Sequence, residues 1–264
     1  MESLNLSLNV HELLYLAKRT DGNMLPGIAD PYRYMSSAQQ ESEEALAEEN
    51  LIEKGIIKAS FGGGKTIPEQ VRDMISCCTL CSRYLAFDRN VSKKMLITER
   101  FYYDQKNWVR ISGNNEEFSV NVTSGDEICK MLKAELPFSK RKFPEKDKIL
   151  MPFTDWKKLS NALSFSDQKT IKEIMQKYQI SKVYESFLKR SLGSETGYTA
   201  FTLAERRKNT MAVQTVSLLS GNGYLMELYH IVQQDRTMVG GISAENGKYP
   251  IMWEVAEKWL TVSL

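Results

Sequence analysis

Apolar residues follow first a helical and then a strand spacing, and the chain passes through this order twice. Between residues 10 and 18 the apolar positions repeat with a helical period. Residues 36–54 predict a second helix, which begins at a serine, carries glutamates in its early turns and stops at Gly55. Pro68 suits the first turn of a third helix that continues to about residue 82. The first part of the chain is therefore predicted to be helical.

The pattern then changes to segments rich in aromatic and β-branched residues, separated by turn-rich stretches. These segments predict four strands, at residues 84–89, 94–103, 108–112 and 118–122. Their short connections favour an antiparallel meander. The meander ends where Thr123 or Ser124 is placed to cap a further helix.

The second half repeats this order of elements without evident sequence identity to the first. Helices are predicted at about 154–163 and 166–191, strands at 198–207, 211–220, 224–233 and 237–243, and a closing helix at 249–260. We therefore predict an α+β fold with an antiparallel β-meander sheet, helices on one side of it, and pseudo-twofold related halves. The halves, about 1–136 and 149–264, would form a single domain joined by a basic connector at 137–148.

Composition and charge narrow the classes of function. The 264 residues are 42% hydrophobic and 26% charged, an ordinary globular balance. The 35 basic and 33 acidic residues are interspersed, so no overall field favours nucleic acid. No stretch approaches the roughly 18 to 20 apolar residues of a membrane span, and no signal peptide is apparent. We expect a cytoplasmic protein that binds no nucleic acid and inserts into no membrane.

The stretch ASFGGGKT, residues 59–66, resembles a phosphate-binding P-loop. Gly64, Lys65 and Thr66 match the end of that motif, whereas Ala59 replaces its first glycine. A P-loop also needs a buried parallel strand before it, and residues 56–58 are too short and directly follow a helix stop. The favoured interpretation is a loop between two helices, and nucleotide binding through these residues is the alternative.

No catalytic or metal-binding constellation emerges from the other reactive residues. Cys78 and Cys81 lie late in a predicted helix, where packing into the core is favoured over redox or zinc chemistry. The two histidines, His11 and His230, are isolated in the sequence and offer little for acid–base catalysis. We therefore predict that the protein is not an enzyme and needs no cofactor.

The aromatic residues of the strands suggest a protein-binding surface instead. One sheet face could remain open and present a mixture of apolar and charged side chains, or a second helical layer could cover it. The candidate contacts are Phe101, Tyr103, Phe201, Leu203, Tyr229 and Ile231.

The order of elements resembles one known family, the EspG-type chaperones of type VII (ESX) secretion systems. The resemblance rests on residues 6–28, on 45–58 followed by a loop and 68–89, and on 220–231 with the final helix at 248–260. It implies a cytosolic, non-enzymatic chaperone that keeps helical secretion substrates soluble by covering an apolar tip. The central sheet and a C-terminal helical bundle would make the contact.

The composition, rich in Lys, Asn, Ile and Tyr, further suggests a Firmicutes-type relative. The expected partners are then helical secreted proteins of the WXG or LXG type, or other secretion components, rather than PE–PPE pairs. The sequence leaves the identity of the client and the oligomeric state open.

Overall fold

A single antiparallel sheet runs through both halves of the chain. The computed structural model describes residues 4–20, 24–59, 64–92, 95–114, 117–135, 149–193, 197–208, 210–221, 224–233 and 236–261. These residues contain eight α-helices, a ten-stranded antiparallel sheet and a separate two-stranded hairpin. The predicted α+β class is thereby confirmed. The proposed connector, 137–148, lies outside the described residues.

The helices and strands have the following bounds. The first half contains β1 (Asn5–Asn9), α1 (Val10–Arg19), the short 3-10 helix η1 (Pro31–Tyr34), α2 (Ser37–Glu53), β2 (Lys58–Ala59), β3 (Lys65–Thr66), α3 (Glu69–Thr79), β4 (Arg83–Ser92), β5 (Met95–Tyr103), β6 (Trp108–Gly113), β7 (Glu117–Thr123) and α4 (Gly125–Glu135). The second contains β8 (Ile149–Pro152), α5 (Phe153–Phe165), α6 (Gln168–Lys177), α7 (Lys182–Gly193), β9 (Tyr198–Arg207), β10 (Thr210–Gly221), β11 (Tyr224–Gln233), β12 (Arg236–Ser243), the 3-10 helix η2 (Ala244–Asn246) and α8 (Tyr249–Thr261).

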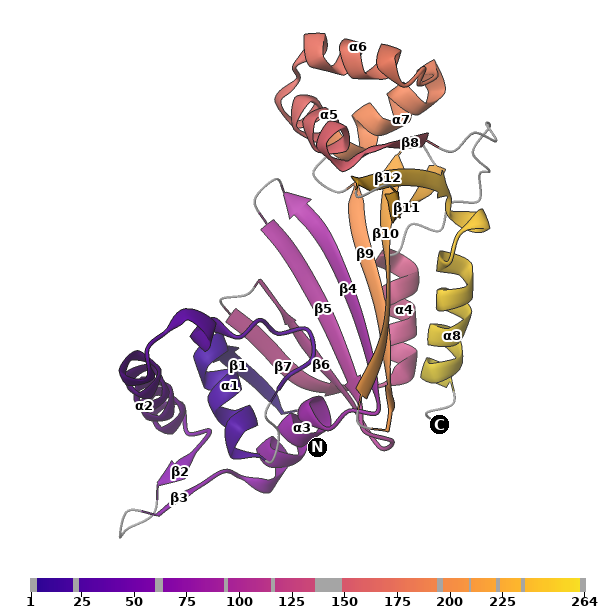
Figure 1. Cartoon of the computed structure of the whole chain (residues 1–264). Coiled ribbons are helices and arrows are strands. Elements are labelled where there is room, and N and C mark those ends of the chain that lie inside the picture. The colour runs from indigo at the N-terminus through magenta and orange to yellow at the C-terminus, as the bar shows by residue number, and fades with distance from the viewer. Residues whose placement is uncertain are drawn as a thin grey trace.

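The order of strands in the sheet reflects the repeat. It runs β1-β7-β6-β5-β4-β9-β10-β11-β12-β8, so each half contributes five adjacent strands in matching order from the centre outward. The halves meet where β4 pairs with β9, and the middle of that register is the pair Ala86 and Thr202. Figure 1 shows the sheet passing from the first half into the second without interruption.

Helices cover both faces of this sheet, and the prediction that they lie on one side is wrong. On one face, α4 and α8 lie side by side and pack on the middle of the sheet (Figure 1). On the opposite face, α1, α2 and α3 cover the strands of the first half, and α5, α6 and α7 cover those of the second. Both faces of several strands carry apolar residues, so two layers are needed to bury them.

Local signals explain most helix bounds. Asn9 and Ser36 begin α1 and α2 with reciprocal capping boxes. The predicted helix at 166–191 is instead two helices, α6 and α7. The chain turns between them at Gln179, whose φ of 50° is incompatible with a continuing α-helix. Periodicity alone did not reveal this turn.

Two short strands at the sheet edges were not predicted. Strand β1 pairs with β7, and β8 pairs with β12. Pro152 ends β8, and an edge strand is where a proline, which has no backbone donor, is tolerated.

Candidate functional site

The candidate site is an open groove on the face opposite α4 and α8. It has a volume of about 820 Å³ and lies over β4, β5, β9 and β10. Its walls come from the segment 24–28 and from the end of α3. The lining residues are Met24, Leu25, Pro26, Gly27, Ile28, Thr79, Leu80, Tyr84, Ala86, Asp88, Thr98, Arg100, Thr202, Ala204, Arg206, Met211 and Val213.

Small residues form the floor of the groove. Ala86 and Thr202 occupy the central register pair of β4 and β9, and Ala204 stands opposite Tyr84. Short side chains leave the backbone of the sheet close to the surface, so an incoming side chain can approach it. The groove therefore exists because β4 and β9 alternate small residues on this face with large ones on the other.

The rim of the groove is apolar and open to solvent. Met24 is 77% exposed, Leu80 53% and Val213 61%. These three side chains belong to different segments and all line the same groove. Exposed apolar residues gathered around a concavity are typical of an interaction site rather than of a monomer's outer surface.

Hydrogen bonds from the sheet hold the 24–28 wall in place. Tyr102 donates its hydroxyl to the Pro26 carbonyl at 2.7 Å, and Arg100 Nε donates to the Gly27 carbonyl at 2.9 Å. Gly27 has a φ of 76°, and a Cβ there would lie 1.9 Å from the Tyr84 hydroxyl oxygen. The wall can adopt this position because residue 27 is a glycine.

The groove contains charged and polar groups beneath its apolar rim. Burial raises the pKa of Tyr84 to about 12, although the neighbouring Arg100 guanidinium acts in the opposite direction. Tyr84 is therefore a neutral hydroxyl at physiological pH. Arg206 donates from Nε to the Cys81 carbonyl at 2.9 Å and from Nη2 to the Thr79 carbonyl at 3.3 Å. These groups can recognise polar atoms of a ligand, and we find no nucleophile–base pair among them.

None of the six predicted partner contacts lines this groove. Phe101, Phe201 and Leu203 are buried in the core between the sheet and the α4–α8 layer. Of the two alternatives that the sequence left open for that face, the second helical layer is the one found at these three residues. Phe201, for example, packs edge-on to Tyr249 of α8, with ring centroids 6.2 Å apart.

The other three predicted contacts are accessible, and their binding role stays a prediction. Tyr103 is partly buried and stacks on Trp108 at 4.9 Å between ring centroids. Tyr229 is also partly buried and lies against the backbone of Gly240. Ile231 is exposed on β11.

The P-loop-like stretch forms part of a hairpin. Residues 60–63 lie outside the described residues, and the flanking strands β2 and β3 pair antiparallel, apart from the main sheet. Lys65 pairs with Glu48 of α2 at 2.6 Å, and Thr66 donates to the Lys58 carbonyl at 3.4 Å. Gly64 directly precedes β3. A P-loop joins a parallel strand to a helix, and the described part of this stretch has no such strand. The nucleotide-binding alternative therefore gains no support.

Cysteine packing into the core is confirmed. Cys77, Cys78 and Cys81 are free thiols and fully enclosed in the core of the first half. Burial raises the pKa of all three, to about 11 for Cys81. Among the described residues, no group of three or more His, Cys, Asp or Glu side chains could hold a metal ion. No helix in this part of the chain is both long and apolar enough to cross a membrane.

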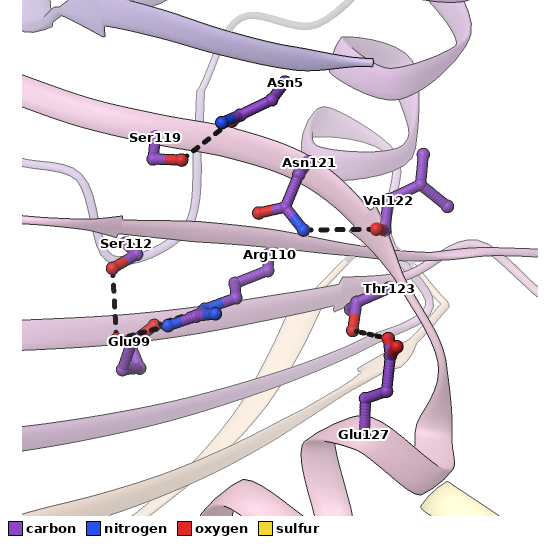
Figure 2. A network of polar contacts seen from close by, with 9 residues as sticks. All are labelled: Asn5, Glu99, Arg110, Ser112, Ser119, Asn121, Val122, Thr123 and Glu127. Carbon is purple, nitrogen blue, oxygen red and sulfur yellow. Dashed lines mark hydrogen bonds and ion pairs between the residues drawn. The ribbon is translucent and has the colours of Figure 1, made fainter. Parts of the chain in front are cut away.

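The first half of the sheet has a contrasting polar surface beyond α4. Glu99 accepts bonds from Arg110 Nε at 2.7 Å and from Ser112 at 3.0 Å, as Figure 2 shows. Ser119 donates to the Asn5 side chain at 2.8 Å nearby. The donors and acceptors of this surface pair with one another, so it offers a partner less than the groove does.

Comparison with protein-family models and with curated protein sequences finds no match. Solved structures do match. One is the type VII secretion system chaperone EspG5 of Mycobacterium tuberculosis, solved in complex with the PE25–PPE41 dimer. The TM-score is 0.53 at 13% sequence identity, over 99% of this chain and 97% of that chain. This likeness shows the fold, and it confirms the EspG-type resemblance at that level.

Proposed function

We propose that this chain is a non-enzymatic secretion chaperone that binds a helical client of a type VII system in the groove. The proposal is carried by one observation, the likeness to EspG5 over nearly the whole of both chains. That chaperone was solved in complex with a PE25–PPE41 dimer. The fold alone does not determine function, so the argument also depends on the site.

The groove suits the apolar tip of a helical protein. A bound client would cover the exposed apolar side chains of the rim, Met24, Leu80 and Val213, and remove their surface from water. The small floor residues would admit one or two side chains of the client close to β4 and β9. Covering such a tip keeps it from associating with other apolar surfaces until it is handed over.

The clients we expect are WXG- or LXG-type helical proteins, met in the cytoplasm of a Firmicutes-type organism. Tyr103, Tyr229 and Ile231 are proposed as further contacts outside the groove. Tyr103 packs on the α4–α8 side of the sheet, opposite the groove, so it would contact a different part of the client.

Co-expression with tagged WXG-type and LXG-type proteins from the same genome tests the proposal. The chain should co-elute with at least one of them, and Val213→Glu should release that client because it places a charge on the apolar rim. Val122→Glu is the matched control. Val122 is a strand valine, 45% exposed, that does not line the groove.

The free energy of unfolding of both variants should lie within about 0.5 kcal/mol of that of the parent chain, since each replaces a surface side chain. If none of these proteins co-elutes, the chaperone proposal fails. If a client co-elutes equally with the Val213→Glu chain, the groove is not its binding site.

A further inference from the structure

Arg100 is a buried cation in the groove, and no carboxylate in the described part of the chain forms an ion pair with it. It is 5% exposed, its Nε donates to the Gly27 carbonyl, and its guanidinium also hydrogen-bonds the Tyr84 hydroxyl. Its Nη1 is enclosed and has no acceptor within hydrogen-bonding distance in that part of the chain. The guanidinium lies 5.7 Å from the centre of the Phe118 ring. An aromatic face, one carbonyl and one hydroxyl only partly compensate a buried positive charge.

Other arginines of the same sheet are paired. Arg110 makes a two-pronged contact with Glu99, at 2.7 and 2.8 Å (Figure 2), and Arg89 pairs with Glu135. Both pairs lie on the opposite face. Arg206 shares the groove with Arg100, but two of its nitrogens already donate to backbone carbonyls. Arg100 is thus the groove arginine that has a buried donor, Nη1, without an acceptor among the described residues.

A buried donor without an acceptor destabilises the folded chain, and a charged donor does so more strongly. Arg100 holds the 24–28 wall through Nε, and Nη1 takes no part in that contact. A ligand that supplies an acceptor would recover the cost on binding.

We propose that Arg100 sets the specificity of the groove by binding the carboxylate of an Asp or Glu beside an apolar residue at the tip of the client. This inference rests on the proposed chaperone function and names the chemistry of its client. A guanidinium presents a planar fork that fits a carboxylate, and their hydrogen bonds are strengthened where water is excluded. The apolar neighbour of the acid would occupy the rim around Met24, Leu80 and Val213.

The groove also orients the acid. In the sheet register Ala86 stands opposite Arg100, and Asp88 stands opposite Thr98. The groove's own carboxylate is therefore two residues along the strand from the guanidinium and would repel a client acid from that end. The Tyr84 hydroxyl, neutral at physiological pH, lies at the Arg100 end. Because Nη1 is enclosed, the client must displace part of the rim as it binds.

A displayed library of helical hairpins with randomised tip residues tests this inference without a known client. The library is selected on the parent chain, on Arg100→Gln and on Arg110→Gln, the matched control on the opposite face. Counter-selection on the Val213→Glu chain removes hairpins that bind elsewhere. The parent and Arg110→Gln chains should enrich tips that combine an apolar residue with Asp or Glu. Arg100→Gln should keep the apolar preference and lose the acidic one.

The affinities of a selected hairpin and of its Asp→Asn counterpart then measure how much the carboxylate contributes to binding. On the parent chain the Asn hairpin should bind about tenfold more weakly or worse, and on Arg100→Gln the two should differ by less than about threefold. The parent-chain comparison needs no variant, so it shows whether the groove prefers a carboxylate even if Arg100→Gln fails to fold; equal binding of the two hairpins overturns the inference.

Two outcomes of the selection also overturn the inference while the chaperone proposal stands: apolar tips enriched on the parent chain without acids, or equal acid enrichment on Arg100→Gln. If no groove-dependent tip is enriched on the parent chain, the inference and the client-binding role of the groove fail together.

Discussion

The two faces of the central strand pair, β4 and β9, are built by the same alternation but differ in their surroundings. On one face Leu85, Phe87 and Phe201 are buried under α4 and α8. On the other, Ala86 and Thr202 form the floor of an open groove. The large residues specify a core, and the small ones leave room for a ligand. The same ten or so residues of each strand thus contribute to stability on one side and to recognition on the other.

The largest effect should come from the covered face. Phe201→Ala removes a fully buried ring and should lower the free energy of unfolding by about 3–5 kcal/mol. Phe165→Ala is the matched control, because that ring is 84% exposed, and it should change the free energy by less than about 0.5 kcal/mol. Urea unfolding of both variants measures the difference. Equal effects would show that the α4–α8 layer does not bury the sheet.

An intermediate effect is expected at the wall of the groove. Gly27→Ala places a methyl group against the Tyr84 hydroxyl at a positive φ, so the 24–28 segment must shift. The free energy of unfolding should fall by about 1–3 kcal/mol. Gly55→Ala is the control, since Gly55 has a similar φ of 69° but nothing within 4 Å of the added carbon. A larger loss of stability from Gly55→Ala than from Gly27→Ala would contradict the close contact between the 24–28 wall and Tyr84.

The thiol beside the groove gives a pH dependence of known sign. Burial raises the pKa of Cys81 from 9.0 to about 11, with Arg206 opposing the shift. Above pH 9.0 the unfolded chain loses this proton first, so stability should fall as pH rises toward about 11. Comparing the parent chain with Cys81→Ala by urea unfolding at pH 8 and pH 10.5 isolates this contribution. A parent chain that gains stability relative to Cys81→Ala over this interval would reverse the sign.

The smallest effect is expected in the β2–β3 hairpin, which is separate from the ten-stranded sheet. Lys65→Ala removes an ion pair with Glu48 whose lysine is about half exposed, so the cost should stay below about 1 kcal/mol. Client binding should be unchanged. Titration calorimetry with Mg-ATP and Mg-GTP should show no binding to the parent chain. Micromolar binding that Lys65→Ala abolishes would revive the nucleotide-binding alternative.

Much of the fold could be predicted from the sequence because its signals are local. Strands β9 and β11 have the predicted bounds, and Ser36 starts α2 through a capping box. The edge strands β1 and β8 escaped prediction because each is short and depends on its neighbour for hydrogen bonds. The turn at Gln179 escaped because no glycine or proline marks it.

The candidate site was harder to predict. Phe101 and Phe201 are candidate contacts as aromatic strand residues, and no local signal shows that α4 and α8, distant in sequence, cover both. The groove brings the 24–28 segment onto β4, β9 and β10, a purely tertiary contact. The only local signal was the run of small residues, Ala86, Thr202 and Ala204, in otherwise bulky strands. Small residues in the middle of a sheet mark a place of close approach.

Site-specific photo-crosslinking can show whether the client occupies the groove. A benzophenone amino acid is incorporated at position 213 or, as the control, at position 122, in a host that makes the chain's own secretion substrates. Position 213 should give a covalent adduct with a helical secreted protein, and position 122 should give none. An adduct that forms from position 122 and not from position 213 would contradict binding of the client in the groove.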